Sequence, residues 1–222
     1  MIKSLSVNLK IFRIEENLLA ENERLAEENR QILGKKGIVA FNLMGGPGTG
    51  KTSLLEKTIP RLPESLPCGI IEGDVAGSLD GERLARLGVP VVQINTGSCH
   101  LDASMVRKGL EHLPLERLKI IFVENVGNLV CPAEFPLGTD KQVVVSAVTE
   151  GDDKPVKYPL MFQVASLCLL NKVDLLPAVN FSVEKFGQNI RQTNSSLKII
   201  SLSAQSGENL NAWVEYVISQ CS

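Results

Sequence analysis

The feature that most constrains this chain is a glycine-rich octapeptide, Gly45-Gly46-Pro47-Gly48-Thr49-Gly50-Lys51-Thr52. It follows an apolar run at residues 38–41 and precedes a segment of helical character at residues 54–57. In the order strand, glycine loop, helix, the backbone can curl so that successive N–H groups point inward beside the positive end of a helix dipole. A side chain larger than hydrogen would obstruct that curl. The octapeptide therefore predicts a loop that wraps the phosphates of a nucleotide.

Two side chains of this loop have separate roles in the hypothesis. Lys51 neutralises the β- and γ-phosphates, and the hydroxyl of Thr52 ligates the magnesium ion that accompanies a nucleoside triphosphate. The full spacing and the flanking elements both favour this P-loop over a merely flexible turn. The residues expected to contact the nucleotide here are Gly46, Pro47, Gly48, Thr49, Gly50, Lys51, Thr52 and Ser53.

Length and charge limit the class of protein. The 222 residues suffice for one large α/β domain, or for one domain with an appended arm. The net charge is -2 and no block of Lys or Arg exceeds two residues, so neither nucleic acid nor a membrane is expected as a partner. No apolar run approaches the ~18 residues that cross a bilayer, and the chain opens with a polar helix, so we expect a cytoplasmic protein.

The sequence of the N-terminal region predicts one long helix, because residues 4–33 contain no proline or glycine. Apolar residues recur at intervals of seven, at Ile11, Leu18, Leu25 and Ile32. The companion row is polar and consists of Glu15, Asn22 and Asn29, so the apolar stripe is too thin for a self-sufficient coiled coil. The helix either packs along its own domain or docks a sister subunit or client. We divide the chain into a helical arm at residues 1–34 and a P-loop domain at residues 35–222.

Strands and helices alternate along the rest of the chain. Apolar runs predict strands at residues 38–41, 68–72, 89–94, 119–123, 143–148, 167–170 and 199–202. Helical segments separate them at residues 54–57, 79–87, 103–113, 159–165, 183–191 and 210–219. Such alternation implies a mainly parallel sheet with helices on both faces. The predicted fold class is α/β, a P-loop NTPase with an N-terminal helical arm.

The end of the predicted strand 167–170 indicates which base is bound. Asn171-Lys172-Val173-Asp174 resembles the N-K-x-D box of GTP-binding proteins, in which the Asp accepts from the ring N–H and the exocyclic amine of guanine. Adenine would leave that acceptor unpaired, which lowers its affinity. Ser203-Ala204-Gln205 resembles the S-A-x loop whose backbone amide meets the guanine carbonyl. We therefore expect GTP or GDP, contacted by Asn171, Lys172, Asp174, Ser203, Ala204 and Gln205.

Acidic residues at strand ends would complete the phosphate site. Glu124-Asn125-Val126-Gly127 occupies the place of the D-x-x-G switch that senses the γ-phosphate. Gly127 offers an N–H without steric cost, and the longer side chain of Glu124 suggests a magnesium contact through water; alternatively, Glu124 is an ordinary acid at a strand end. Asp74 and Asp80 lie where either could contact magnesium or orient the attacking water, and we favour Asp74 for magnesium. With Lys51, these residues form the expected catalytic set.

Cys99-His100 and Cys131-Pro132 suggest a transition-metal site. Thiolate and imidazole are ligands that zinc and nickel prefer, and both groups follow strands that we expect to be neighbours. Cys131 lies four residues after Gly127, so an ion held there would be mechanically linked to the γ-phosphate switch. The three ligands Cys99, His100 and Cys131 leave a fourth position to water or to a second subunit. The odd number of cysteines, five, favours reduced thiols or metal ligands over a disulfide framework. Free or disulfide-bonded cysteines are the alternative to the metal site.

Together these motifs resemble the HypB-type GTPases of the SIMIBI class, which help to insert nickel into [NiFe] hydrogenase. The resemblance runs from about Gly37 to the C-terminus. Beyond the P-loop and Asn171-Lys172-Val173-Asp174, it rests on Glu72-Gly73-Asp74-Val75 with Asp80 and Arg83, on Asn95-Thr96-Gly97, on Cys99-His100-Leu101-Asp102, on the segment from Glu124 to Ala133, and on Thr149-Glu150-Gly151-Asp152-Asp153-Lys154-Pro155.

The resemblance implies slow GTP hydrolysis, a nucleotide-dependent homodimer, and a nickel or zinc site at the dimer interface made by Cys99, His100 and Cys131 of each subunit. It also implies partners in hydrogenase maturation, namely a nickel-delivery protein and the hydrogenase large subunit. Some members carry an N-terminal C-x-x-C-G-C motif or a His-rich stretch. This chain has no Cys or His before Cys68, so we do not expect N-terminal nickel storage.

The resulting hypothesis is a molecular switch. GTP and magnesium order the loops that carry Asp74 and Gly127, close two subunits and alter the metal site through Cys131, and hydrolysis releases the ion or the client. Three alternatives stay open at this point: a urease-type nickel-insertion GTPase, whose characteristic Cys-Pro-His is absent here, a P-loop small-molecule kinase, and a non-catalytic docking subunit.

Overall fold

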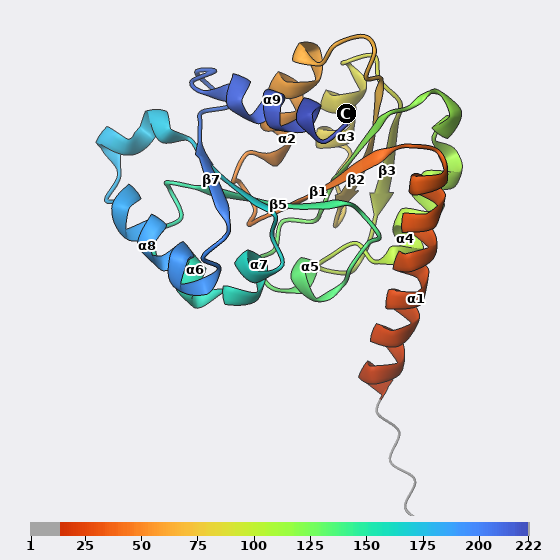
Figure 1. Ribbon diagram of the computed structural model, residues 1–222, viewed down its shortest axis with the longest axis horizontal. Helices are drawn as coiled ribbons and strands as arrows, with labels where there is room; N and C mark the ends of the chain where they lie inside the picture. The colour runs from red at the N-terminus through yellow and green to blue at the C-terminus, as the bar shows by residue number, and fades with distance from the viewer. Residues whose placement is uncertain (1–13, 222) are drawn as a thin grey trace, which may run out of the picture.

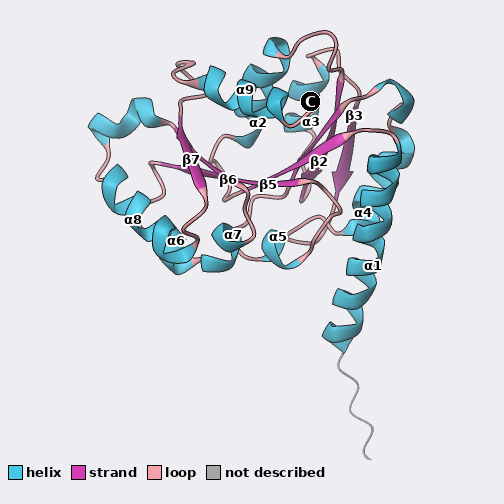
Figure 2. Ribbon diagram, in the orientation of Figure 1, coloured by secondary structure: helices cyan, strands magenta, loops and turns pink. Residues whose placement is uncertain are grey.

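The computed structural model describes residues 14–221, which form a seven-stranded parallel sheet with helices on both faces (Figures 1 and 2). The strands are β1 (Val39–Met44), β2 (Cys68–Asp74), β3 (Val91–Asn95), β4 (Ile120–Glu124), β5 (Lys141–Ala147), β6 (Leu167–Asn171) and β7 (Lys198–Ser201). All seven predicted strands are present, so the predicted α/β fold class is confirmed. The helices are α1 (Ile14–Lys35), α2 (Lys51–Thr58), η1 (Ile59–Arg61), α3 (Leu79–Ala85), α4 (Ala103–His112), η2 (Leu115–Arg117), α5 (Cys131–Glu134), α6 (Lys154–Lys157), α7 (Pro159–Gln163), η3 (Val173–Ala178), α8 (Val183–Thr193) and α9 (Leu210–Ser219).

The strand order corrects one prediction. Across the sheet the order is β3-β2-β4-β1-β5-β6-β7, and each pair of neighbours is parallel. Strands β3 and β4, which precede Cys99-His100 and Cys131, are therefore not neighbours, because β2 lies between them. Strands buried on both faces share the same apolar pattern, so the sequence does not reveal which of them pair. All strands end at one edge of the sheet, where ligands bind in folds of this kind.

Helices α2, α3 and α9 cover one face of the sheet (Figure 1). The ring of Phe41 on β1 stacks on Phe122 of β4 at 5.5 Å and meets the edge of Trp213 on α9 at 6.0 Å. Trp213 is fully buried, and its Nε1 donates to Thr58 Oγ1 at 2.9 Å. A buried indole needs such an acceptor. This contact holds α9 against α2, the helix that begins in the P-loop.

Helix α1 packs along α4 on the other face, and its first turns extend beyond the rest of the molecule (Figure 1). Its buried residues are Asn22, Ala26, Asn29 and Leu33, whereas Leu18 is 61% exposed. The inward side therefore carries Asn22 and Asn29 together with Ala26 and Leu33. The long helix is confirmed for residues 14–35 and packs along its own domain. The division at residues 34 and 35 stays a prediction, and residues 1–13, which include Ile11, lie outside the described part of the chain.

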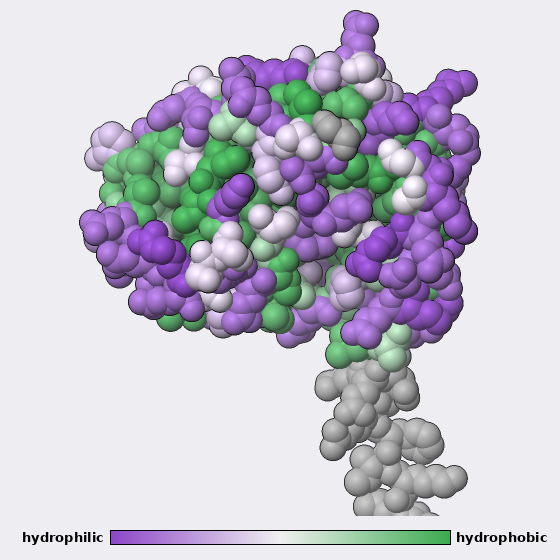
Figure 3. Space-filling model, viewed as in Figure 1, coloured by the Kyte–Doolittle hydropathy of each residue, from purple (hydrophilic) through white to green (hydrophobic). Residues whose placement is uncertain are grey.

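The outward side of α1 and α4 carries mostly hydrophilic residues (Figure 3). Within residues 14–221, no helix combines the length and the apolar character that a bilayer crossing requires.

The sequence did not predict α5 and α6, because each is a single turn of four residues and offers no apolar period to detect. Both have a proline in their first turn, which suits the beginning of a helix.

We expect the substitution Gly138→Ala to destabilise the fold by about 1–3 kcal/mol. Gly138 has a φ of 86°, and an added Cβ would collide with the carbonyl oxygen of Ala26 on α1 and lie 2.7 Å from Asn29 Cβ. The matched control is Gly34→Ala, because Gly34 lies in α1 with open space around it. That change should stabilise the protein by about 0.5–1 kcal/mol. Urea unfolding measures both, and equal midpoints for the two variants would contradict the close packing of α1.

Candidate functional site

A cleft of about 350 Å³ opens where β1, β2 and β4 end. Most of the predicted P-loop contacts line it, together with Asp74, Asp80, Glu124, Gly127 and Lys172. Gly46 and Thr49 do not line it. Thr49 is fully buried, and its hydroxyl donates to the Gly46 carbonyl at 3.0 Å. The cleft thus joins residues that are far apart in the sequence and that carry the predicted phosphate chemistry.

The P-loop lysine rests on its own loop. Lys51 is 7% exposed, and its Nζ donates to the carbonyl oxygens of Gly45 and Gly46 at 3.2 Å each. Burial lowers the pKa of Lys51, and the nearby acids, chiefly Glu124 and Glu150, oppose that shift. The ammonium group is therefore held by neutral carbonyls in a cleft where phosphate oxygens would be stronger, charged partners.

Two buried glutamates face this cleft from adjacent strands. Glu72 on β2 and Glu124 on β4 are register partners, and they are 2% and 5% exposed. Glu124 Oε1 accepts from Thr52 Oγ1 at 2.7 Å, whereas the Oε2 atoms of both glutamates have no partner within the described residues. Burial, reinforced by the neighbouring acids, raises the pKa of Glu72 to about 8. Burial also raises the pKa of Glu124 to about 7, although Lys51 and Thr52 oppose it.

This set of donors fits a magnesium ion. Hard divalent cations prefer carboxylate and hydroxyl oxygens, and the cleft presents the Thr52 hydroxyl beside two buried carboxylates with unpaired oxygens. A buried acceptor without a partner is uncommon and calls for a reason. A cation bound between these oxygens would supply the missing partner and would favour the ionised form of both glutamates.

The other predicted acids are engaged in local contacts. Asp74 accepts hydrogen bonds from the backbone N–H groups of Val75 at 2.7 Å and Gly77 at 3.0 Å, so it shapes the loop that follows β2. Asp80 forms an ion pair of 2.7 Å with Arg83, which also pairs with Glu56 of α2 at 2.6 Å. Both aspartates line the cleft, but each would have to exchange a present contact in order to bind magnesium or water.

The predicted base-binding residues lie next to the P-loop. Asn171 Nδ2 donates to the Thr49 carbonyl at 2.8 Å, and Asn171 Oδ1 accepts from the Ala204 N–H at 3.0 Å. Asn171 therefore joins the P-loop to the loop that contains Ser203 and Gln205. Lys172 Nζ donates to the Gly48 carbonyl at 2.6 Å. Asp174 is exposed at the start of η3, and its carboxylate can therefore accept from a ligand.

The three predicted transition-metal ligands come together although their strands are not neighbours. Ligand atoms of Cys99, His100 and Cys131 all lie within 4.8 Å of one another, and the two Sγ atoms are 2.8 Å apart. Among the described residues, this is the only such group of three. Burial lowers the pKa of His100, which favours the neutral imidazole that binds metals. Contact with Cys99, with burial second, raises the pKa of Cys131 to about 11, so an ion would have to displace the thiol proton.

The segment between Glu124 and Cys131 connects the two sites. An added Cβ on Gly127 would lie 2.9 Å from Pro47 Cα, so this segment touches the P-loop. Asn128 pairs with Gly45 in an isolated β-bridge, and its Oδ1 accepts from the N–H of Cys131 at 3.2 Å. Asn125 lines the cleft, and its Oδ1 accepts from the N–H of Leu101, next to His100, at 3.0 Å.

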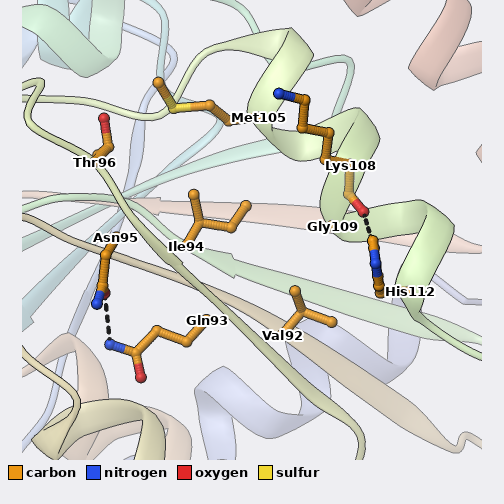
Figure 4. Close-up of a pocket in the computed structure, with 9 residues that line it drawn as sticks. All are labelled: Val92, Gln93, Ile94, Asn95, Thr96, Met105, Lys108, Gly109 and His112. Carbon is orange, nitrogen blue, oxygen red and sulfur yellow. Dashed lines mark hydrogen bonds between the residues drawn. The ribbon is translucent and has the colours of Figure 1, made fainter.

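A second cleft, of about 540 Å³, lies between β3 and α4 (Figure 4). Val92, Ile94 and Met105 contribute apolar surface, and Lys108 and His112 stand on the helix side. His112 is exposed, and its ring contacts the Lys108 carbonyl at 2.8 Å. None of the predicted nucleotide or metal residues lines this cleft, so the predicted chemistry lies elsewhere.

Comparison with known proteins agrees with this geometry. The model of the family described as CobW/HypB/UreG, nucleotide-binding domain, matches residues 39–201. The chain belongs to the CobW/HypB/UreG family. It is 48% identical over 212 residues to the hydrogenase maturation factor HypB of Escherichia coli strain K12, which covers 95% of this chain and 73% of that protein. This similarity confirms the resemblance to HypB-type proteins.

Two solved HypB structures have the same fold. HypB from Helicobacter pylori in complex with nickel superposes with a TM-score of 0.86 at 32% identity, covering 90% of this chain and 95% of the other. HypB from Archaeoglobus fulgidus superposes with a TM-score of 0.85 at 41% identity, covering 91% and 100%. The chain therefore carries the nucleotide-binding fold of the CobW/HypB/UreG family over most of its length.

Sequence reasoning missed three contributors to the site in this family member. Glu72 was not singled out, although an acid inside the otherwise apolar strand 68–72 was a readable signal. Asn125 and Asn128 were noted only as members of a motif, and their hydrogen bonds to Leu101 and Cys131 depend on how distant loops pack. No local pattern in the sequence indicates those partners.

We expect the substitution Glu72→Gln to reduce the loss of stability that occurs as pH rises. In the folded protein the pKa of Glu72 is raised from 4.5 to about 8. The protonated side chain therefore contributes fully to the free energy of unfolding below about pH 4.5, and this contribution is lost as pH rises through about 8. Glutamine has no charge to bury. The melting temperature of nucleotide- and metal-free protein should therefore fall less between about pH 6 and about pH 9 in the variant than in the wild type.

The control for this measurement is Glu64→Gln, because Glu64 is exposed. It should retain the wild-type dependence on pH. If Glu72→Gln and Glu64→Gln give the same pH profile, Glu72 does not titrate as a buried acid.

Proposed function

We propose that this chain is a GTP-hydrolysing metallochaperone that binds nickel or zinc and assists nickel insertion into [NiFe] hydrogenase. The observation that carries the proposal is the short connection between the phosphate cleft and the Cys99, His100 and Cys131 triad. Its relatives support the client, since the matching protein of Escherichia coli is a hydrogenase maturation factor. The proposed partners are a nickel-delivery protein and the hydrogenase large subunit.

We propose that Asp174 recognises guanine. Asn171 and Lys172 support the P-loop through their hydrogen bonds to its carbonyl groups. The hydrogen bonds of Asn171 to Thr49 and Ala204 support this role, because they hold the loop of Ser203, Ala204 and Gln205 against the phosphate loop. A charged acceptor that only guanine can satisfy would exclude ATP. This preference separates the proposal from a small-molecule kinase that uses the same P-loop.

For hydrolysis, Lys51 would leave the carbonyls of Gly45 and Gly46 and bind the β- and γ-phosphates, and the Gly127 N–H would contact the γ-phosphate. Thr52 and Glu124 would hold magnesium, with Asp74 on the neighbouring loop, and the ion would neutralise charge on the phosphates. Asp80 and Asp74 are the candidates to orient the attacking water. Positioning by these residues is consistent with slow turnover.

The metal triad is proposed to hold nickel or zinc. Two thiolates and one imidazole leave one position of a four-coordinate ion to water or to a second copy of the chain. Cys99 is exposed, so that position can be reached from outside the subunit. A homodimer formed in the GTP state would bring two triads together, as the resemblance implies.

The substitution Asp174→Asn tests the choice of base. It removes a charged acceptor, so the affinity for GDP should fall roughly 10- to 100-fold while that for ADP should not. Isothermal titration with both nucleotides measures the change. Glu184→Gln, an exposed carboxylate on α8, serves as the control and should leave GDP affinity unchanged. Equal binding of ADP and GDP by the wild type would instead favour the kinase.

The substitution Asn128→Ala tests the connection between the sites. In the wild type, nickel affinity should differ by about 5-fold or more between GDP-loaded and GTP-analogue-loaded protein. Removing the amide that holds the Cys131 N–H should bring that ratio toward one. Asn128→Asp keeps the acceptor and should keep the ratio. Identical nickel affinities in the apo, GDP and GTP-analogue states of the wild type would rule out the coupling.

A further inference from the structure

Helix α1 forms hydrogen bonds to the segment that follows His100 and to the segment that follows Cys131. Asn22, which is 6% exposed, donates through Nδ2 to the Pro136 carbonyl at 2.9 Å and accepts at Oδ1 from the Ala103 N–H at 2.8 Å. Ala103 lies three residues after His100, and Pro136 lies five residues after Cys131. One buried side chain thus connects the two loops through opposite ends of its amide.

A second asparagine repeats the arrangement two turns further along α1. Asn29 is fully buried, and its Nδ2 donates to the carbonyls of Ala103 at 2.8 Å and Leu137 at 3.0 Å. Its Oδ1 accepts from Arg107 Nε on α4 at 2.8 Å. Both asparagines therefore bridge the start of α4 and the segment 136–137. The inward polar row of α1 lies where two loops need hydrogen-bond partners.

The two backbone groups that Asn22 bonds lie close to His100 in the sequence or to a residue that contacts its imidazole. The Ala103 N–H is the first of α4, and such groups at a helix start have no partner within the helix. Asn22 supplies that partner from another element. On the other side, Pro136 follows Phe135, whose ring stacks on His100 with centroids 4.0 Å apart and 25° between the planes. Asn22 thus holds the backbone on both sides of the His100 ring.

We propose that α1 positions the metal centre, with Asn22 as the positioning residue that sets the separation of the His100 and Cys131 loops. The inference rests on the proposed metal-binding function. Ligands on two separate loops bind an ion tightly only if the distance between the loops is defined before binding, because ordering them afterwards costs entropy. Groups that orient metal ligands by hydrogen bonding typically change affinity about 10- to 100-fold when they are replaced.

The test is Asn22→Asp. A carboxylate still accepts from the Ala103 N–H but cannot donate to the Pro136 carbonyl, so the substitution removes the contact to one loop and keeps the contact to the other. Nickel titration of the full chain should show an affinity about 10- to 100-fold below wild type. The thiolate-to-nickel absorption bands of the bound ion should shift, because the geometry at His100 changes. GDP affinity should stay at the wild-type value.

The matched control is Asn194→Asp on the opposite side of the molecule. Asn194 likewise donates to a carbonyl, that of Phe162, at 3.1 Å and accepts from the Ser196 N–H at 3.2 Å. It should leave both nickel affinity and the absorption bands unchanged. Should Asn22→Asp fold poorly, Asn29→Asp breaks the second bridge instead. A carboxylate still accepts from Arg107 Nε but cannot donate to the carbonyls of Ala103 and Leu137, so it should shift the same bands.

A third variant separates this inference from the proposed function. Cys131→Ala should abolish tight nickel binding. If it binds nickel as the wild type does, the triad is not the metal site and both proposals are overturned. If Cys131→Ala loses nickel while Asn22→Asp and Asn29→Asp keep wild-type affinity and bands, the metal site stands and the positioning role of α1 is overturned.

Discussion

The segment that follows β4 carries the interactions on which both candidate pockets depend. It starts from Glu124, the last residue of β4, which accepts from the P-loop hydroxyl of Thr52, and it ends at Cys131, one of the three candidate metal ligands. Between them, Asn128 pairs with Gly45 and holds the Cys131 N–H. The contacts of Asn128 therefore join the P-loop backbone to the backbone of Cys131 within one short segment. Packed segments of this kind tend to occupy discrete arrangements.

The nucleotide cleft is electrostatically incomplete by itself. Glu72 and Glu124 are buried as register partners on adjacent strands, and among residues 14–221 one carboxylate oxygen of each has no hydrogen-bond partner. Burial raises the pKa of both, so the cleft disfavours its own negative charge. Lys51 rests meanwhile on neutral carbonyls. A ligand that brought both a cation and phosphate groups would provide partners for the two carboxylates and for Lys51 at once.

Helix α1 departs in part from the usual rule that an amphipathic helix turns an apolar stripe inward. Its inward side alternates Asn22 and Asn29 with Ala26 and Leu33, while Leu18 is exposed. The reason lies in what the helix covers. The start of α4 and the segment 136–137 present backbone N–H and C=O groups, and these need partners when they are buried. Asparagine offers a donor and an acceptor on one short side chain, so it can satisfy two loops together.

The sequence by itself determined the parts whose physics is local. The P-loop, the alternation of strands and helices and the Asn171 to Asp174 box each depend on residues close along the chain, so their spacing predicted the fold class. The family was predicted from the resemblance of the motifs to HypB-type GTPases, and the family match confirms it. The convergence of Cys99, His100 and Cys131 was also anticipated, although from a strand pairing that is wrong because β2 lies between β3 and β4.

Only the tertiary structure decided the order of the strands, the pairing of Glu72 with Glu124, and the hydrogen bonds of Asn22 to Ala103 and Pro136. Asn22 and its partner Ala103 are 81 positions apart. A hydrogen bond between residues so distant leaves no periodic trace in the sequence. It exists because the sheet and its helices bring the two loops to one place, where burial then requires every polar group to find a partner.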